Sequence, residues 1–163
     1  MINKEDFTII IDTREHLGVI SRYILPYFKK NGIKFIFEKL DFGDYSFLYR
    51  GEAFKNKFAI ERKMSLVELA GNFSNGRKRF EAEFQRAKDN GASIVLMVEN
   101  GSLSGIIDKT YNTNFNNKAY YATILSWRQK FNIQVDFVLD KYAGLHIYYS
   151  CYYFLRNEVE KNG

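Results

Sequence analysis

Cysteine, histidine and proline are scarce in this chain of 163 residues. The single cysteine, Cys151, excludes an internal disulfide and fits a protein of the reducing cytoplasm. One cysteine with two histidines also argues against a structural zinc site. The single proline, Pro26, lies within the first helical pattern, where it is expected to kink or end a helix.

Long apolar runs and several common enzyme motifs are also missing. No apolar run approaches the roughly 20 residues that span a bilayer, and the polar start, Met1 to Asp6, is not a secretory signal pattern. Neither the Gly-x-Gly-x-x-Gly motif nor the P-loop motif occurs. The Gly-x-Ser-x-Gly elbow is absent as well. These absences argue against a membrane-spanning protein, a dinucleotide enzyme, a P-loop NTPase and a serine hydrolase.

The composition that remains is typical of a single globular domain. Hydrophobic residues make up 46% of the chain, enough for a sizeable core. The net charge of +5 permits nucleic-acid binding without requiring it. Aromatic residues make up 17%, and core packing is the favoured role for most of them. Base stacking is the alternative for those in and after the Asn-rich segment 109–117, which are Tyr111, Phe115, Tyr120, Tyr121 and Trp127.

Apolar segments with strand character alternate with segments of helical periodicity, and one hairpin lies between them. This alternation predicts a three-layer α/β/α domain with a central mixed sheet, in which the hairpin is the antiparallel part. The whole chain, 1–163, is expected to be one domain. Strands are expected at 7–11, 34–40, 42–50, 58–63, 93–98 and 133–139, and helices at 17–30, 65–71, 77–89, 103–108, 119–131 and 143–160.

The predicted hairpin carries the most informative residues. Folding the chain about residue 53 places Asp44 roughly opposite Arg62, and strand alternation directs Glu61 and Lys63 to one face. Two carboxylates can hold Mg²⁺, while the ammonium can orient a water or offset charge at a phosphate. The alternative is a solvated sheet edge with a protective lysine. The apolar approach Phe58 to Ile60 favours the first interpretation.

Four further features have both a functional and a structural interpretation. Asp12 follows a predicted buried strand, so it either opens into a cleft or caps the next helix. The cations of the segment 77–79 begin a helix, where they either bind a phosphate or form a solvated charge run. Ser65 and Glu68 form a capping-box pattern, which makes Glu68 a cap rather than a catalyst. The tyrosines of the last predicted helix are either buried by the sheet or meet another protein.

Four ordered motifs resemble the nuclease domain of the XPF-type structure-specific endonucleases. They are Asp12-Thr13-Arg14-Glu15, Gly43-Asp44-Tyr45, Ile60-Glu61-Arg62-Lys63 and Asn75-Gly76-Arg77-Lys78-Arg79-Phe80. This family belongs to the restriction-endonuclease-like, PD-(D/E)xK, superfamily, and the chain is similar to its compact bacterial and phage members. The family often has an Asp four residues after the lysine; here that position is Val67, and Glu68 comes one residue later.

The resemblance implies a Mg²⁺-dependent or Mn²⁺-dependent DNA endonuclease of the restriction-endonuclease-like fold, acting on branched or otherwise structured DNA in repair or recombination. Because the family's nuclease domains commonly pair, it also implies a homodimer, with the aromatic last helix as the expected contact. The chain departs from the larger relatives in having no tandem helix-hairpin-helix domain, and a cytoplasmic location is expected. The alternatives are a non-catalytic DNA-binding or partner module and a domain unrelated to nucleic acid. The implied metal ligands are Asp12, Glu15, Asp44 and Glu61, with the Arg62 carbonyl; the implied catalytic residues are Asp44, Glu61, Arg62 and Lys63; the DNA contacts are Arg14, Arg77, Lys78 and Arg79.

Overall fold

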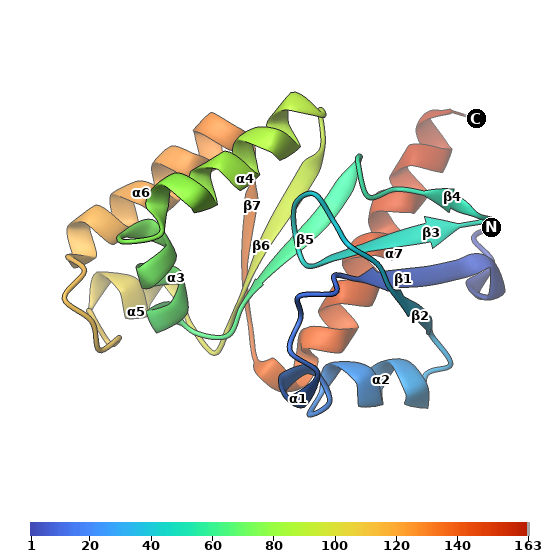
Figure 1. Cartoon of the computed structure of the whole chain (residues 1–163), viewed down its shortest axis with the longest axis horizontal. Helices are drawn as coiled ribbons and strands as arrows, with labels where there is room; N and C mark the ends of the chain where they lie inside the picture. Colours follow the sequence, from blue (N-terminus) through green and yellow to red (C-terminus); the bar gives the residue numbers. More distant parts are fainter. Residues whose placement is uncertain (163) are drawn as a thin grey trace.

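The computed structural model describes residues 1–162, which form a sheet with helices on both of its faces (Figure 1). The expected three-layer α/β/α arrangement with a central mixed sheet is therefore confirmed. Among these residues, no helix is both long enough and apolar enough to cross a membrane. The strands in this range are β1 (Phe7–Ile11), β2 (Lys34–Phe37), β3 (Tyr45–Tyr49), β4 (Glu52–Ala53), β5 (Phe58–Lys63), β6 (Ser93–Glu99) and β7 (Gln134–Val138).

The order of the strands places the ends of four neighbouring strands side by side at one end of the sheet. The order is β2-β1-β3-β5-β6-β7, with the short β4 paired to β3. Strand β3 is antiparallel to both β1 and β5, whereas β5, β6 and β7 are parallel. The amino end of β3 therefore lies beside the carboxyl ends of β1, β5 and β6. Ligands of α/β sheets commonly bind outside such carboxyl ends.

Each face of the sheet has its own apolar core. One core packs α2 and α7 on the sheet, and the other packs α3, α4 and α6. The second core includes Trp127 and Tyr120, which are 1% and 0% exposed, so core packing is confirmed for these rings. The helices are α1 (Leu17–Ile20), α2 (Ile24–Lys30), α3 (Leu66–Phe73), α4 (Arg77–Asp89), α5 (Leu103–Ile107), α6 (Asn117–Phe131) and α7 (Ala143–Lys161), with short 3₁₀ helices at Lys4–Asp6 and Asp140–Tyr142.

The expected helix at 17–30 is two helices, and the proline explains the break. α1 ends at Ile20, and α2 begins at Ile24. Pro26 lies in the first turn of α2, where its missing N–H has no helical partner to lose. Its ring excludes a helical bond to the carbonyl of Arg22, so the first helix cannot run through this point. The proline therefore separates the two helices and lies in the first turn of the second.

The hairpin is shorter than expected at its start and more regular at its turn. β3 begins at Tyr45, because the preceding residues form a loop, and Tyr45 pairs with Ile60 of β5. The chain turns at Arg50 and Gly51, which both have positive φ angles of 52° and 81°. Such a turn fits the twist of paired strands, and it allows Glu52–Ala53, expected as part of a turn, to pair with β3 as β4.

Candidate active site

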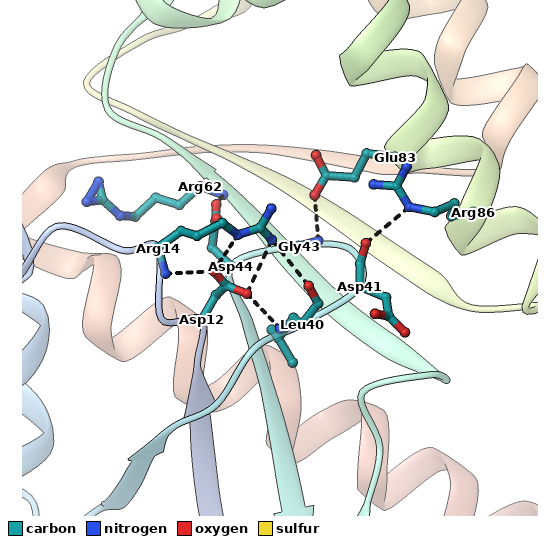
Figure 2. Close-up of polar contacts among 9 residues, drawn as sticks. All are labelled: Asp12, Arg14, Leu40, Asp41, Gly43, Asp44, Arg62, Glu83 and Arg86. Carbon is teal, nitrogen blue, oxygen red and sulfur yellow. Dashed lines mark hydrogen bonds and ion pairs between the residues drawn. The ribbon is translucent and has the colours of Figure 1, made fainter.

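Asp12 holds the end of β1 to the loop that precedes β3 (Figure 2). Its Oδ1 accepts hydrogen bonds from the backbone N–H and Nε of Arg14, at 2.8 and 2.7 Å. Its Oδ2 accepts from the backbone N–H of Leu40 at 2.7 Å. Burial alone would raise the pKa of Asp12, but the hydrogen bonds from Arg14 and Leu40 outweigh it and hold this pKa below its usual value. Both carboxylate oxygens are therefore engaged within the chain.

Asp44, Glu61 and Lys63 line one open cavity of about 360 Å³ at the edge of the sheet. Asp44 stands at the amino end of β3, and its Oδ2 accepts the backbone N–H of Arg62 at 2.7 Å. Glu61 and Lys63 share one face of β5, and Lys63 Nζ lies 2.8 Å from Glu61 Oε1. The hairpin predicted from the sequence thus brings a carboxylate from each of two strands together with an amine. The other residues of the cavity are Arg14, Asn72, Gly76, Arg79, Phe80 and Glu83.

The two cavity carboxylates have raised pKa values in the protein alone. Burial, followed by the charge of Glu15, raises the pKa of Asp44 to about 7. Burial and the charge of Asp44 raise the pKa of Glu61 well above its usual value. Burial tends to lower the pKa of Lys63, but its contact with Glu61 outweighs this effect and raises it, so the amine stays protonated. Without a further cation, the cavity therefore disfavours the ionised forms of Asp44 and Glu61.

The donor set fits a hard divalent cation held by few protein ligands. Glu61 Oε2 is buried and has no hydrogen-bond partner among residues 1–162, and a buried unpaired carboxylate oxygen is costly. In the same range no three His, Cys, Asp or Glu side chains gather as a metal-binding group, so the four carboxylates implied by the resemblance do not form one cluster. Mg²⁺ usually binds proteins through one or two carboxylates and keeps several waters, which matches Asp44 and Glu61.

The side chain of Arg62 lies on the opposite face of β5 from Glu61 and Lys63. Its Nε is 3.1 Å from Glu15 Oε2 and its Nη1 is 3.6 Å from Glu99 Oε1. Its side chain is 3% exposed, and Tyr45 Oη donates to the same Glu15 oxygen at 2.5 Å. Burial disfavours the charged guanidinium, but Glu15 and the neighbouring groups outweigh this and raise the pKa of Arg62. This buried ion-pair network supports the strand that carries Glu61.

The four cations proposed as DNA contacts are placed differently from one another. Arg77 turns inward, where its Nη1 donates to Phe73 O at 3.3 Å and to Thr123 Oγ1 at 3.1 Å. Lys78 is exposed, and Arg79 is exposed while lining the cavity. The side chain of Arg14 bonds Asp12 yet remains 60% exposed and lines the cavity as well. Three of these cations therefore face solvent, two of them at the cavity.

Glu68 caps the start of α3, as the sequence predicts. The backbone N–H of Glu68 donates to Ser65 Oγ at 3.1 Å, and Glu68 Oε2 accepts the backbone N–H of Met64 at 2.7 Å. The second bond comes from the residue before the N-cap, so the capping box is shifted by one position from its usual form. Glu68 Oε1 also lies 3.9 Å from Lys63 Nζ, which places this cap beside the cavity.

Glu83, Glu99 and Asn72 also belong to this region, although the sequence analysis assigned them no role. Glu83 accepts the backbone N–H of Gly43 at 2.8 Å. Glu99 ends β6, and a carboxylate after a continuous apolar strand is the same signal that marked Asp12. Asn72 lines the cavity, and its Oδ1 is the second buried side-chain oxygen without a partner among residues 1–162. No local pattern marks Asn72.

Comparison with known proteins gave one family and several structures. The ERCC4 domain family matches residues 11–151. The structure of XPF from Aeropyrum pernix is similar with a TM-score of 0.64 at 18% identity, over 88% of this chain and 59% of that one. The structure titled XPF from Aeropyrum pernix, complex with DNA, gives 0.67 at 17% identity, over 92% and 66%. Comparison with curated proteins gave no match.

These comparisons confirm the fold and the resemblance to XPF-type nucleases. The chain spans about 59% and 66% of the lengths of the two XPF structures, so it corresponds to part of each. The family match extends from the end of β1 into α7, and it includes Asp44, directly before β3, and Glu61 of β5. The chain belongs to the ERCC4 domain family.

Proposed function

We propose that this chain is a metal-dependent DNA endonuclease that hydrolyses phosphodiester bonds. The observation that carries the proposal is Glu61 Oε2, which is buried without a hydrogen-bond partner in the described part of the chain, 1–162, and lies in a cavity that also contains Asp44 and Lys63. A bound Mg²⁺ or Mn²⁺ would polarise the scissile phosphate and lower the pKa of a water molecule. Membership of the ERCC4 domain family and likeness to a structure titled as a complex with DNA support nucleic acid as the substrate.

Asp44 and Glu61 are proposed to hold the cation, with the Arg62 carbonyl as a further ligand. Lys63 is proposed to orient the attacking water or to stabilise the negative charge that develops on the phosphate. Its contact with Glu61 at 2.8 Å keeps the amine protonated and fixes its position. Asp12 and Glu15 are proposed to support the site, because each is engaged with an arginine. Arg62 acts through β5, where it holds the strand from the opposite face.

The DNA backbone is proposed to cross the mouth of the cavity. Arg14 and Arg79 line this cavity, and the exposed Lys78 lies next to Arg79. Guanidinium groups can bind phosphate with two parallel hydrogen bonds. Arg77 is proposed to hold α4 in place rather than to contact DNA, because its side chain already bonds Phe73 and α6.

The finer parts of the proposal concern substrate, assembly and location. We propose branched or junction-containing DNA as the substrate, a role in repair or recombination, and a cytoplasmic homodimer acting as one nuclease domain. On α7, Tyr149 and Tyr153 are 43% and 51% exposed, whereas Tyr148 is buried, so the helix offers an aromatic strip for the dimer contact. Sedimentation of the parent and of Tyr153→Asp checks the dimer: only the variant should lose it.

A nuclease assay tests the function directly. Duplex, single-stranded, flap and four-way DNA are incubated with the parent, Glu61→Ala and Lys63→Ala, with Mg²⁺, with Mn²⁺ and with chelator. The parent is expected to cut only with metal, and both variants are expected to bind DNA without cutting it. Glu81→Ala is the matched control, because it removes a carboxylate that pairs with Lys130 away from the cavity. DNA binding by the parent without cutting under any condition would favour the alternative, a non-catalytic DNA-binding module.

A further inference from the structure

The loop before β3 is held by side chains of α4 (Figure 2). The backbone N–H of Gly43 donates to Glu83 Oε1 at 2.8 Å. One turn further along α4, Arg86 Nε donates to the carbonyl of Asp41 at 3.2 Å. From the other side, Arg14 Nη2 donates to the carbonyl of Leu40 at 3.2 Å. Side chains from two separate elements therefore fix the backbone of this loop directly before Asp44.

The backbone around Asp44 leaves little freedom between this loop and the cavity. Gly43 has a φ of 76°, and a Cβ at this position would lie 2.6 Å from Ala59 Cβ. The next N–H, that of Asp44, donates to the carbonyl of Ile60 at 2.7 Å. Glu83 therefore holds the peptide plane before Gly43, and β5 holds the plane after it. A shift of Gly43 would act on Asp44 through the peptide that joins them.

Contacts along α4 hold this helix, and with it Glu83, in place. Phe80, Phe84 and Ala87 bury one side of the helix in the core. Arg77 ties its first turn to α6, and Lys88 Nζ donates to the carbonyl of Lys130 at 2.8 Å near its last turn. A helix anchored along its length can hold Glu83 at a constant distance from the β3 loop.

The charge of Glu83 acts on both the carboxylates and the cation of the cavity. It adds to the raised pKa values of Asp44 and Glu61, and it also raises the pKa of Arg14. The direct contact of Glu83 with the loop before β3 is the hydrogen bond that it accepts from the Gly43 N–H. Residues that orient a metal ligand commonly affect metal affinity by about 10-fold to 100-fold when they are replaced.

We infer that Glu83 is a positioning residue that acts through Gly43 to place the Asp44 carboxylate beside Glu61. The inference rests on the proposed function, because it concerns the metal site that Asp44 and Glu61 would form. It predicts that the hydrogen-bond acceptor of Glu83 matters and that its charge does not. A glutamine at this position keeps a side-chain oxygen that can accept the Gly43 N–H.

Titration calorimetry with Mn²⁺, without DNA, tests the inference. Glu83→Ala is expected to weaken Mn²⁺ binding about tenfold, and Glu83→Gln is expected to stay within about threefold of the parent, because it keeps the acceptor. Glu81→Ala is the matched control. It removes the same charge from the same helix, but Glu81 pairs with Lys130 and not with the loop, so this variant should bind Mn²⁺ as the parent does. If Glu83→Ala does not fold, Glu83→Met replaces it, since Met keeps the side-chain length without a strong acceptor.

Three outcomes would overturn the inference in distinguishable ways. Equal Mn²⁺ affinity of Glu83→Ala and the parent would show that the contact with Gly43 does not position the Asp44 carboxylate. Equal weakening in Glu83→Gln and Glu83→Ala would show that the charge acts and the hydrogen bond does not. Absence of Mn²⁺ binding in the parent, or binding unchanged in Glu61→Ala, would instead remove the metal site of the proposed function, and the inference with it.

Discussion

Replacing Asp44 by asparagine should stabilise the metal-free protein at alkaline pH while it removes metal binding. The folded protein raises the pKa of Asp44 from 3.8 to about 7, through burial and the charge of Glu15. An acid whose pKa is raised by folding binds a proton more tightly in the folded state. The contribution of Asp44 to the free energy of unfolding is therefore fully present below about pH 4 and is lost as the pH rises through about 7. Asparagine is neutral throughout, and its side-chain oxygen can still accept the N–H of Arg62.

The pKa shift sets the size of this effect. A rise of about 3 units, at roughly 1.4 kcal/mol for each unit, corresponds to at most about 4 kcal/mol at pH 8. Removing the charge of Asp44 also relieves Glu61, whose pKa it raises, and this adds in the same direction. At pH 5, about one unit above the unfolded pKa of 3.8, the loss is only about 1.6 kcal/mol, so the difference between the parent and Asp44→Asn should be less than half of that at pH 8.

Urea unfolding with a chelator, at pH 5 and pH 8, measures the difference. Asp44→Asn should have the larger free energy of unfolding at pH 8, and Mn²⁺ should then raise the stability of the parent alone, because a ligand stabilises only the folded state that binds it. If the variant is no more stable than the parent at pH 8, the repulsion between Asp44 and its neighbours is absent and the electrostatic description of the cavity is incorrect.

Four substitutions test other parts of the site. Gly43→Ala forces a Cβ to 2.6 Å from Ala59 at a positive φ, so urea unfolding should show a loss of roughly 1 to 3 kcal/mol or more, and parent-like stability would mean that the loop can move aside. Arg62→Ala removes the guanidinium that pairs with Glu15 and Glu99 and should cost about 3 kcal/mol at pH 8 in the same assay; a cost near zero would refute the network behind β5. Arg79→Ala should weaken DNA binding in filter assays and reduce by about one the slope of log K against log salt concentration, without lowering Tm. Arg77→Ala should instead lower Tm, because its side chain holds α4 to α6. The reverse pattern would exchange the roles of the two arginines.

Local periodicity was sufficient to predict the fold and the hairpin. The alternation of Phe58 to Lys63 puts Glu61 and Lys63 on one face whatever packs against the strand, and their 2.8 Å contact confirms it. The continuous apolar run of β6 marks a strand covered on both faces. The approach of Asp44 to Arg62 follows from hairpin pairing, which links residues close in sequence, and the hydrogen bond at 2.7 Å confirms it.

Contacts between distant segments could not be predicted in this way. Arg62 pairs with Glu15 and Glu99 only because β1, β5 and β6 end at one edge of the sheet, and strand order is not written in any local pattern. Arg77 turns towards Thr123 because α4 packs on α6, which reverses the expectation for a cation at an exposed helix start.

The sequence does contain a signal for the position of Glu83 on its helix. Arg79, Glu83 and Arg86 follow at spacings of four and three, so they share one face of a helix. This face borders the buried stripe formed by Phe80 and Phe84. Polar residues beside a buried stripe are placed to reach neighbouring backbone, yet the sequence does not say that the backbone reached is the loop before β3.

The location of a bound Mn²⁺ ion in a crystal of the protein tests the central claim most directly. Anomalous scattering at the manganese edge should give one strong peak between the carboxylates of Asp44 and Glu61, with Lys63 Nζ beside it but not bound to it. The peak should vanish in Glu61→Ala and remain in Glu81→Ala. A peak elsewhere, for example at the Asp136 and His146 pair on the far side of the sheet, or no peak at a saturating Mn²⁺ concentration, would contradict the account.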